Sequence, residues 1–167
     1  MDDFVRYLDE IVDPTVADFE AKPASVRHAF LTCVAVFHAI DYLAYPNPSR
    51  GLRNQYKAKS RAFALVDRVA HAFKHVETNP RQPTNLIASS VIARPPAVMG
   101  VMEYGLSITG DIAGAVTLKE DPSISVLDAV KEAVKFLKEQ TRVEINSSKR
   151  SRRAVNRAMR ASGESLS

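Results

Sequence analysis

The sequence has very little of several features that define whole classes of protein. Its 167 residues include one cysteine, six glycines and no tryptophan, and aromatic residues make up only 7%. The single Cys33 cannot form an internal disulfide, so a disulfide-stapled fold is excluded and a buried thiol in a reducing compartment is expected. The glycines form no phosphate-binding loop, which argues against the common nucleotide-binding folds. The scarcity of aromatic residues argues against a nucleic-acid platform built on stacked bases.

Long hydrophobic runs are missing as well. No stretch approaches the roughly 20 apolar residues that cross a bilayer. The opening Met-Asp-Asp-Phe-Val lacks the basic start and the apolar core of a signal peptide. With 46% hydrophobic and 25% charged residues, the composition is that of an ordinary globular protein. We therefore expect a cytoplasmic domain with an appendage and no membrane span.

Charge is distributed unevenly along the chain. The net charge is +4, from 23 Lys and Arg against 19 Asp and Glu, and the first twenty residues carry seven acids against one arginine. Residues 149–160 hold six cations and no acid; these are Lys149, Arg150, Arg152, Arg153, Arg157 and Arg160. We expect residues 147–167 to form a basic tail, helical or disordered. Such a tail either contacts nucleic acid, an acidic protein or an anionic membrane surface in a salt-dependent way, or is a solvated terminus.

Hydrophobic residues at helical spacing predict helices in the first part of the chain. One helix is expected over residues 2–12, and another is expected to begin at Asp13-Pro14 with Asp13 as its N-cap. Ser25 is placed to cap a long central helix over residues 26–44, which the Pro46-Asn47-Pro48 run would end.

A second long helical pattern begins after Gly51 and stops at Thr78-Asn79-Pro80. Its expected buried face consists of Tyr56, Phe63, Val66, Ala70 and Phe73. Because few residues separate this pattern from the preceding helix, the two long helices should pack antiparallel.

Residues 86–119 have a different pattern, rich in β-branched residues and in alternation. They predict a small antiparallel sheet. Met102, Tyr104, Leu106 and Ile108 alternate on one expected strand, and Ile112, Val116 and Leu118 alternate on the next. A three-residue turn from Thr109 to Asp111 would place both sets on one face. Asp121-Pro122-Ser123 should then start the last core helix.

The predicted fold class is therefore mainly α (α+β). We expect an antiparallel helical bundle over residues 1–146, with a β-hairpin at about 86–119 inserted before the last core helix. The basic tail follows this domain.

Polar side chains gather on the two long helices. One run contains Asp67, Arg68, His71, Lys74 and His75, and the facing helix carries His38 and Asp41. At about 100° per residue, Asp67 and Lys74 lie over one another beside the apolar stripe, whereas Arg68, His71 and His75 share the neighbouring face. The polar cluster of His38, Asp41, Asp67, His71 and Lys74 is the candidate site. The alternative is a solvated helix face.

Two kinds of chemistry fit this pattern. His71 and His75 have the i, i+4 spacing that lets two imidazoles reach one metal ion, which Asp67, or His38 with Asp41, could complete. Alternatively, Arg68 could hold a phosphate while His75 moves a proton, the minimum for metal-independent cleavage of RNA beside its 2′-hydroxyl. The pattern has no Glu between the histidines and no separate ligand cluster, so neither a metal nor a cofactor is expected.

The long-helix pair, ending with Asp67 and the run Ala-His-Ala-Phe-Lys-His, resembles the HEPN-type α-helical bundles of many bacterial proteins. The resemblance covers about Ala24 to Glu77. Active members of that family imply dimeric RNases of toxin and defence systems, with an Arg, a polar residue directly after it and a His four to six residues beyond.

Arg68 and His75 have six residues between them, but Val69 stands where the family has a polar residue. The resemblance therefore implies a homodimeric binding or regulatory module without nuclease activity. A metal-independent RNase using Arg68 and His75, or a metal-binding bundle, is the alternative.

Overall fold

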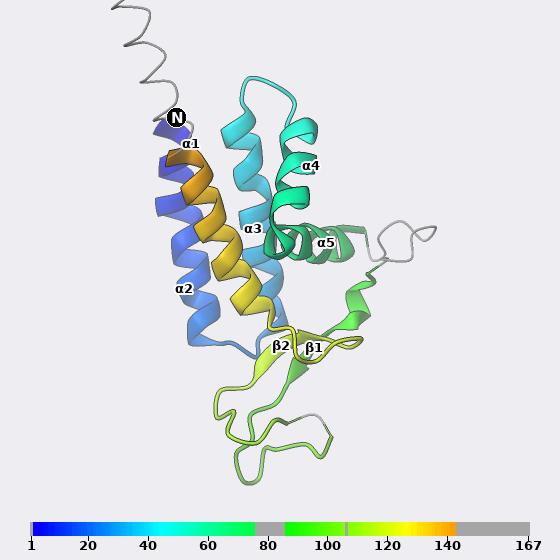
Figure 1. The fold of residues 1–167 in the computed structure, drawn as a ribbon. Helices are drawn as coiled ribbons and strands as arrows, with labels where there is room; N and C mark the ends of the chain where they lie inside the picture. Colours follow the sequence, from blue (N-terminus) through cyan, green and yellow to red (C-terminus); the bar gives the residue numbers. More distant parts are fainter. Residues whose placement is uncertain (1, 76–85, 106, 143–167) are drawn as a thin grey trace, which may run out of the picture. The chain divides into compact units, whose positions relative to one another are not determined.

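A computed structural model describes residues 2–75, 86–105 and 107–142 of the chain. Backbone contacts divide the chain into two units, Met1–Val134 and Lys135–Ser167. The fold is mainly α with one two-stranded antiparallel sheet in the described residues, which confirms the predicted fold class (Figure 1). The predicted basic tail and its six cations lie outside the described residues.

The chain begins with one uninterrupted helical segment instead of the two helices that the sequence predicts. It consists of α1 (Asp2–Tyr7), the π-helical turn η1 (Leu8–Val12) and α2 (Asp13–Ala21). Asp13 has helical dihedral angles, so its predicted role as an N-cap is wrong. Pro14 has no N–H to donate, and its ring crowds the carbonyl four residues earlier. The π turn just before it, closed by the Asp13 N–H on the Leu8 carbonyl, provides the extra space.

The central helix is α3 (Val26–Ala44), and its predicted limits are confirmed. Ser25 caps it, because the Ser25 Oγ accepts a hydrogen bond of 3.4 Å from the backbone N–H of His28. Cys33, Val36 and Ile40 are completely buried in the core. By length and composition α3 is also the one described helix that could cross a membrane, a test that core helices of soluble proteins pass as well.

The second long helix of the prediction is in fact two helices, α4 (Arg50–Lys59) and α5 (Arg61–His75). Ser60 has extended dihedral angles, and its Oγ accepts a 3.1 Å hydrogen bond from the Phe63 N–H, which starts a new helix. In Figure 1, α4 runs antiparallel to α3, whereas α5 turns away from α4 and crosses α3. The predicted buried residues Tyr56, Phe63, Val66 and Ala70 are buried, and Phe73 is half-buried.

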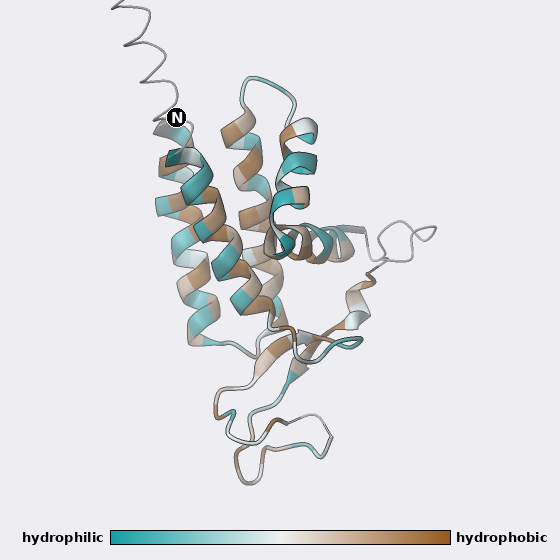
Figure 2. Ribbon diagram, in the orientation of Figure 1, coloured by the Kyte–Doolittle hydropathy of each residue, from teal (hydrophilic) through white to brown (hydrophobic). Residues whose placement is uncertain are grey.

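The helices α4 and α5 each have a hydrophobic and a hydrophilic side, and α3 is hydrophobic over most of its surface (Figure 2). A helix over residues 126–142 follows the sheet, and Ser125 caps it by accepting a 3.2 Å hydrogen bond from the Asp128 N–H. The helix thus begins later than Asp121-Pro122-Ser123, where residues 122–123 form a turn. Val126, Val130 and Val134 are buried, and the Lys131 ammonium lies 2.7 Å from the Glu20 carboxylate of α2.

The sheet pairs β1 (Val91–Arg94), which follows the 3₁₀ turn η2 (Ala88–Ser90), with β2 (Ala115–Leu118). The register joins Val91 to Leu118 and Arg94 to Ala115. The predicted strand over Met102–Ile108 and its three-residue turn are wrong, because the described residues between 95 and 114 form a long loop. Pro95-Pro96 cannot donate to a strand ladder, and Gly100, Gly105 and Gly110 adopt positive φ angles that interrupt an extended chain.

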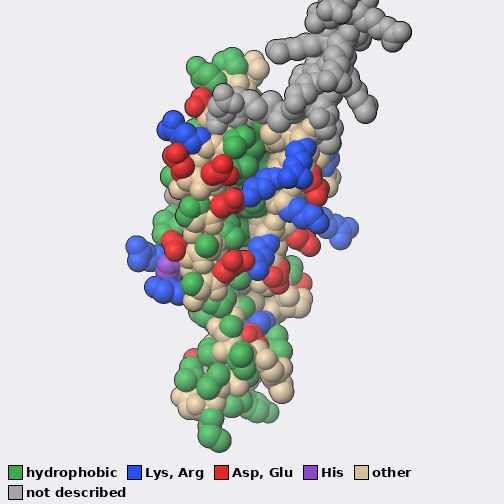
Figure 3. Space-filling model, turned by 90° about the vertical axis from the view of Figure 1, so that its left-hand side faces the viewer, with side chains coloured by type: hydrophobic (Ala, Val, Ile, Leu, Met, Phe, Trp, Pro, Cys, Tyr) green, Lys and Arg blue, Asp and Glu red, His purple; other side chains and the backbone are tan. Residues whose placement is uncertain are grey.

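The ends of this loop are held together by Asp111. Its carboxylate lies 2.7 Å from the Arg94 guanidinium and also accepts hydrogen bonds from the N–H groups of Ala113 and Gly114. The bond from Arg94 is the largest influence on the pKa of Asp111 and lowers it. The loop is apolar and exposed: Met99 and Ile112 are 94% and 79% exposed, and many hydrophobic side chains lie at the lower end of the molecule in Figure 3.

Candidate functional site

A cavity of about 140 Å³ opens between α3 and α5. We call it the histidine cavity; it is lined by Phe30, Val34, Phe37, His38, Ala70, His71 and Lys74. The His38 and His71 rings both meet the Phe37 ring at nearly right angles, with centroids 5.0 and 4.9 Å from it. The two imidazole centroids are therefore at most about 10 Å apart.

His38 is oriented by an aspartate one turn along its own helix. Its Nδ1 lies 2.9 Å from a carboxylate oxygen of Asp41. Because an ionised carboxylate can only accept, the Nδ1 carries the hydrogen and the Nε2 of neutral His38 carries the lone pair. The His38 side chain is 46% exposed, so the imidazole is accessible from solvent. This pair gives the cavity one base whose tautomer is set by the protein.

Asp41 is held by α4 as well as by His38. The Arg53 guanidinium, which also stacks 4.2 Å above the centroid of Phe37, lies 3.4 Å from the second carboxylate oxygen of Asp41. Burial raises the pKa of Asp41, but hydrogen bonds from Ser49 and His38 and the charge of Arg53 outweigh it, so the pKa is lowered. Asp41 therefore remains ionised at neutral pH and can accept the hydrogen bond from the His38 Nδ1.

The second aspartate, Asp67, plays a comparable part on α5. It is only 4% exposed, and one carboxylate oxygen lies 3.0 Å from the Lys57 ammonium of α4. The Nδ1 of His71 lies 2.8 Å from the Asp67 carbonyl oxygen and 3.8 Å from its carboxylate. The other carboxylate oxygen, Oδ1, is buried without a hydrogen-bond partner among the described residues. The Asp67 carbonyl thus orients His71, and the Asp67 carboxylate links α5 to α4 through Lys57.

The predicted polar cluster is brought together by the fold. His38, His71 and Lys74 line the cavity, and Asp41 and Asp67 hold the two imidazoles. Arg53 and Lys57 were missed by sequence reasoning, although their i, i+4 spacing on a polar helix was a usable signal. They reach the cluster only because the chain breaks at Ser60 and folds α4 against α5.

Arg68 does not line the cavity. It lies in the middle of α5, directly after Asp67, and its charge acts on Glu120, whose carboxylate accepts a hydrogen bond from the Ser90 hydroxyl. That hydrogen bond lowers the pKa of Glu120 most, and the Arg68 charge lowers it further, so the guanidinium is near Glu120. The side chain of His75, the last residue of α5, lies outside the described part of the chain. The predicted pairing of Arg68 with His75 thus stays a prediction.

Within residues 2–75, 86–105 and 107–142, no three His, Cys, Asp or Glu side chains are arranged to hold a metal ion. His38, Asp67 and His71 therefore do not form the metal site considered above, and His75 cannot be placed in it. Cys33 is completely buried, and burial raises the pKa of its thiol, which removes it as a nucleophile.

Comparisons of the chain with family models, with curated proteins and with solved structures gave no match.

Proposed function

We propose that the chain is a HEPN-like binding module whose histidine cavity contacts a phosphate group of nucleic acid. The observation that carries this proposal is the placement of His38, held by ionised Asp41, in one cavity with His71 and Lys74. A protonated imidazole and an ammonium both donate charged hydrogen bonds to phosphate oxygens. In this proposal the protein is a homodimer of the bacterial cytoplasm, and the basic tail adds a second contact with nucleic acid or another acidic partner.

The balance of charge supports an anionic ligand. Arg53 and Lys57 are engaged by Asp41 and Asp67, whereas Lys74 is exposed and makes no salt bridge among the described residues. A negatively charged group that enters the cavity therefore meets a cation at the rim and imidazoles inside.

Binding of a short single-stranded RNA to the full chain, measured by fluorescence anisotropy at low salt, tests the proposal. His38→Ala and Lys74→Ala should each weaken binding by about tenfold, equal to ~1.4 kcal/mol. Lys59→Ala is the matched control, because Lys59 is an exposed lysine of α4 outside the cavity lining. Unchanged affinity in both cavity variants, with native circular dichroism, would mean that the cavity is not the contact.

A second candidate function, metal-independent RNA cleavage, is favoured by the Asp41–His38 pair. The His38 Nε2 would take the proton of a 2′-hydroxyl, whose oxygen attacks the adjacent phosphorus. The bond to the 5′-oxygen breaks, and His71 returns a proton to that leaving oxygen. This assignment places the chemistry on different residues from the predicted Arg68 and His75.

Incubation of RNA with the wild-type protein, His38→Ala and His75→Ala separates these assignments. Cleavage through the cavity should stop in His38→Ala and in an RNA with a single 2′-deoxy substitution at the cleaved position. Loss in His75→Ala alone would instead support the Arg68 and His75 pair. Intact RNA with the wild-type protein would leave binding as the function.

A further inference from the structure

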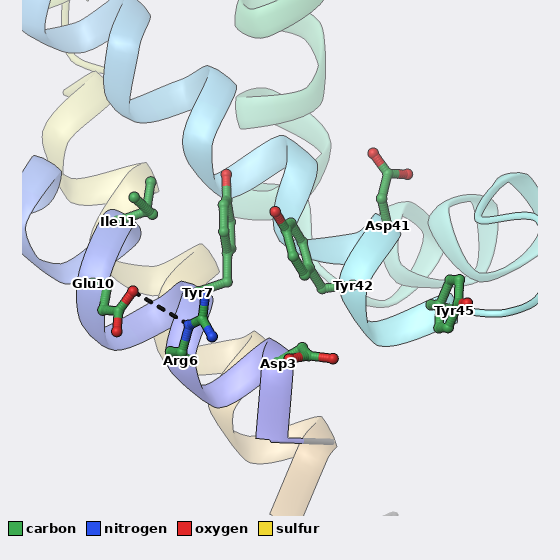
Figure 4. Close-up of a pocket in the computed structure, with 8 residues that line it drawn as sticks. All are labelled: Asp3, Arg6, Tyr7, Glu10, Ile11, Asp41, Tyr42 and Tyr45. Atoms are coloured by element: carbon green, nitrogen blue, oxygen red, sulfur yellow. Dashed lines mark ion pairs between the residues drawn. The ribbon is translucent and has the colours of Figure 1, made fainter.

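A larger pocket, of about 600 Å³, lies between the N-terminal helical segment and the C-terminal end of α3. Three tyrosines line it, Tyr7 from α1 and Tyr42 and Tyr45 from the end of α3, and we call it the tyrosine pocket (Figure 4). Its volume falls within the range of roughly 300–1,000 Å³ that small-molecule sites occupy. It is separate from the histidine cavity, although Asp41 contributes to its wall.

The aromatic wall of the tyrosine pocket is held in place. The Tyr7 and Tyr42 rings stack with their centroids 4.2 Å apart and their planes 18° from parallel. The Tyr7 hydroxyl donates a 3.0 Å hydrogen bond to the Ala35 carbonyl oxygen, which fixes the ring between α1 and α3. Tyr42 and Tyr45 are 45% and 81% exposed, so aromatic surface remains open to a ligand. Aromatic faces attract cations through their negative π electron density.

The charged groups of the tyrosine pocket also favour a positively charged ligand. Asp3, Glu10 and Asp41 contribute carboxylates, and Arg6 contributes the single cation of the lining. The Asp41 carboxylate is already engaged by His38 and Arg53, so the negative charge open to a ligand comes from Asp3 and Glu10. Arg6 pairs with Glu10 at 3.4 Å, where both side chains are more than half exposed, so solvent weakens that pair. Asp3 makes no salt bridge with any described side chain. Burial and, after it, the neighbouring Tyr42 and Asp41 raise the pKa of Tyr7, so its hydroxyl stays protonated and keeps its hydrogen bond to Ala35.

We infer that the tyrosine pocket binds a small organic cation, an aliphatic amine whose ammonium lies against the tyrosine faces and is neutralised by Asp3. An anionic ligand would be repelled by the excess of carboxylates, and an uncharged apolar ligand would desolvate them without compensation. An aliphatic diamine satisfies both the aromatic wall and the acidic rim. This inference concerns a second site with a ligand of opposite charge, and it does not depend on the proposed function.

Isothermal titration of the full chain with putrescine tests the inference, with its neutral diol analogue and succinate as matched ligands. We expect putrescine to bind and the other two not to bind, with an affinity that falls as salt is added. Asp3→Asn and Tyr42→Leu should each weaken putrescine binding by about tenfold. Tyr42→Phe should retain it because the aromatic face is kept. Asp9→Asn, which removes an exposed acid outside the pocket, should have no effect.

Equal binding of the diol, or no effect of Asp3→Asn and Tyr42→Leu in protein with native circular dichroism, would overturn the inference. The same variants should bind single-stranded RNA like the wild-type protein, because neither residue touches the histidine cavity. Failure at the tyrosine pocket is therefore distinguishable from failure of the proposed RNA contact.

Discussion

Lys57 and Asp67 form an ion pair whose two members are buried to very different extents. The Lys57 side chain is 37% exposed, whereas that of Asp67 is 6% exposed. Lys57→Met leaves a buried carboxylate without its cation and should lower the free energy of unfolding by about 2–3 kcal/mol. Asp67→Asn leaves an ammonium that can turn toward water and should cost about 1 kcal/mol. Urea denaturation of both variants measures the difference.

Arg6→Met is the control for this comparison, because Arg6 also pairs with a carboxylate but on the surface. The Arg6 and Glu10 side chains are 71% and 62% exposed. Removal of such a pair changes stability by less than about 0.5 kcal/mol. If Lys57→Met proves as mild as Arg6→Met, the burial of Asp67 contributes little, and α4 is held against α5 by its apolar contacts instead.

The residues of the histidine cavity and their aspartate partners were predictable from helical geometry, but the cations of α4 that pair with those aspartates were not. The spacing of Asp67, His71 and Lys74 along one helix suffices to place them together. The contact of Arg53 with Asp41 depends on how α4 and α3 pack, which no spacing within one helix specifies. Arg68 could not be placed from spacing either. It is next to Asp67 in the sequence, but its charge acts on Glu120, which follows β2, because of how α5 packs in the folded chain.

Gly114 lies directly before β2, and we expect the stability of the β1–β2 sheet to depend strongly on this glycine. Its φ angle is +69°, and an added Cβ would lie 2.6 Å from the Arg94 carbonyl oxygen and 3.1 Å from the Pro96 nitrogen. Both of these are backbone atoms, which cannot turn aside. We expect Gly114→Ala to lower the free energy of unfolding by about 2–3 kcal/mol, the sum of backbone strain and overpacking. Urea denaturation and amide NMR signals of β1 and β2 measure the effect.

Gly100→Ala separates the two contributions. Gly100 also has a positive φ, +83°, but an added Cβ there would meet nothing within 4 Å. This variant carries the strain alone and should cost about 1 kcal/mol. Equal losses for Gly114→Ala and Gly100→Ala would contradict the close approach of Gly114 to β1.

The elements that the sequence predicts well are those with one strong local signal. Ser25 as a cap and the prolines after Ala44 define α3, and its length is confirmed. The pair Asp13-Pro14 is typical of a helix start, which is why two helices were predicted. The π turn before it makes room for the proline ring, so the helical segment continues without a break. Ser60 is a residue type that often caps helices. The hydrophobic residues keep helical spacing on both sides of it, so a break between α4 and α5 was not predicted. The alternation at 102–108 belongs to an exposed loop, because glycines and prolines prevent the ladder that alternation predicts.

At the scale of the whole molecule, two cationic contacts with nucleic acid are proposed, and salt distinguishes them. The histidine cavity offers few charges, whereas residues 149–160 carry six. Each phosphate neutralised on a single strand adds about 0.7 to the slope of log affinity against log salt concentration. The tail could therefore account for a slope of up to about four, and the cavity for one or less.

Truncation after Ser148 should weaken binding of single-stranded RNA and flatten its dependence on salt, because it removes Arg150, Arg152, Arg153, Arg157 and Arg160 together with Lys149. His38→Ala should weaken binding at every salt concentration and leave the slope nearly unchanged. Anisotropy titrations of the wild-type chain and both variants over a series of salt concentrations measure these effects. Unchanged affinity and slope after truncation would show that the tail makes no contact with RNA. Since the truncated chain retains the histidine cavity, any affinity that remains and is then lost in His38→Ala belongs to that cavity.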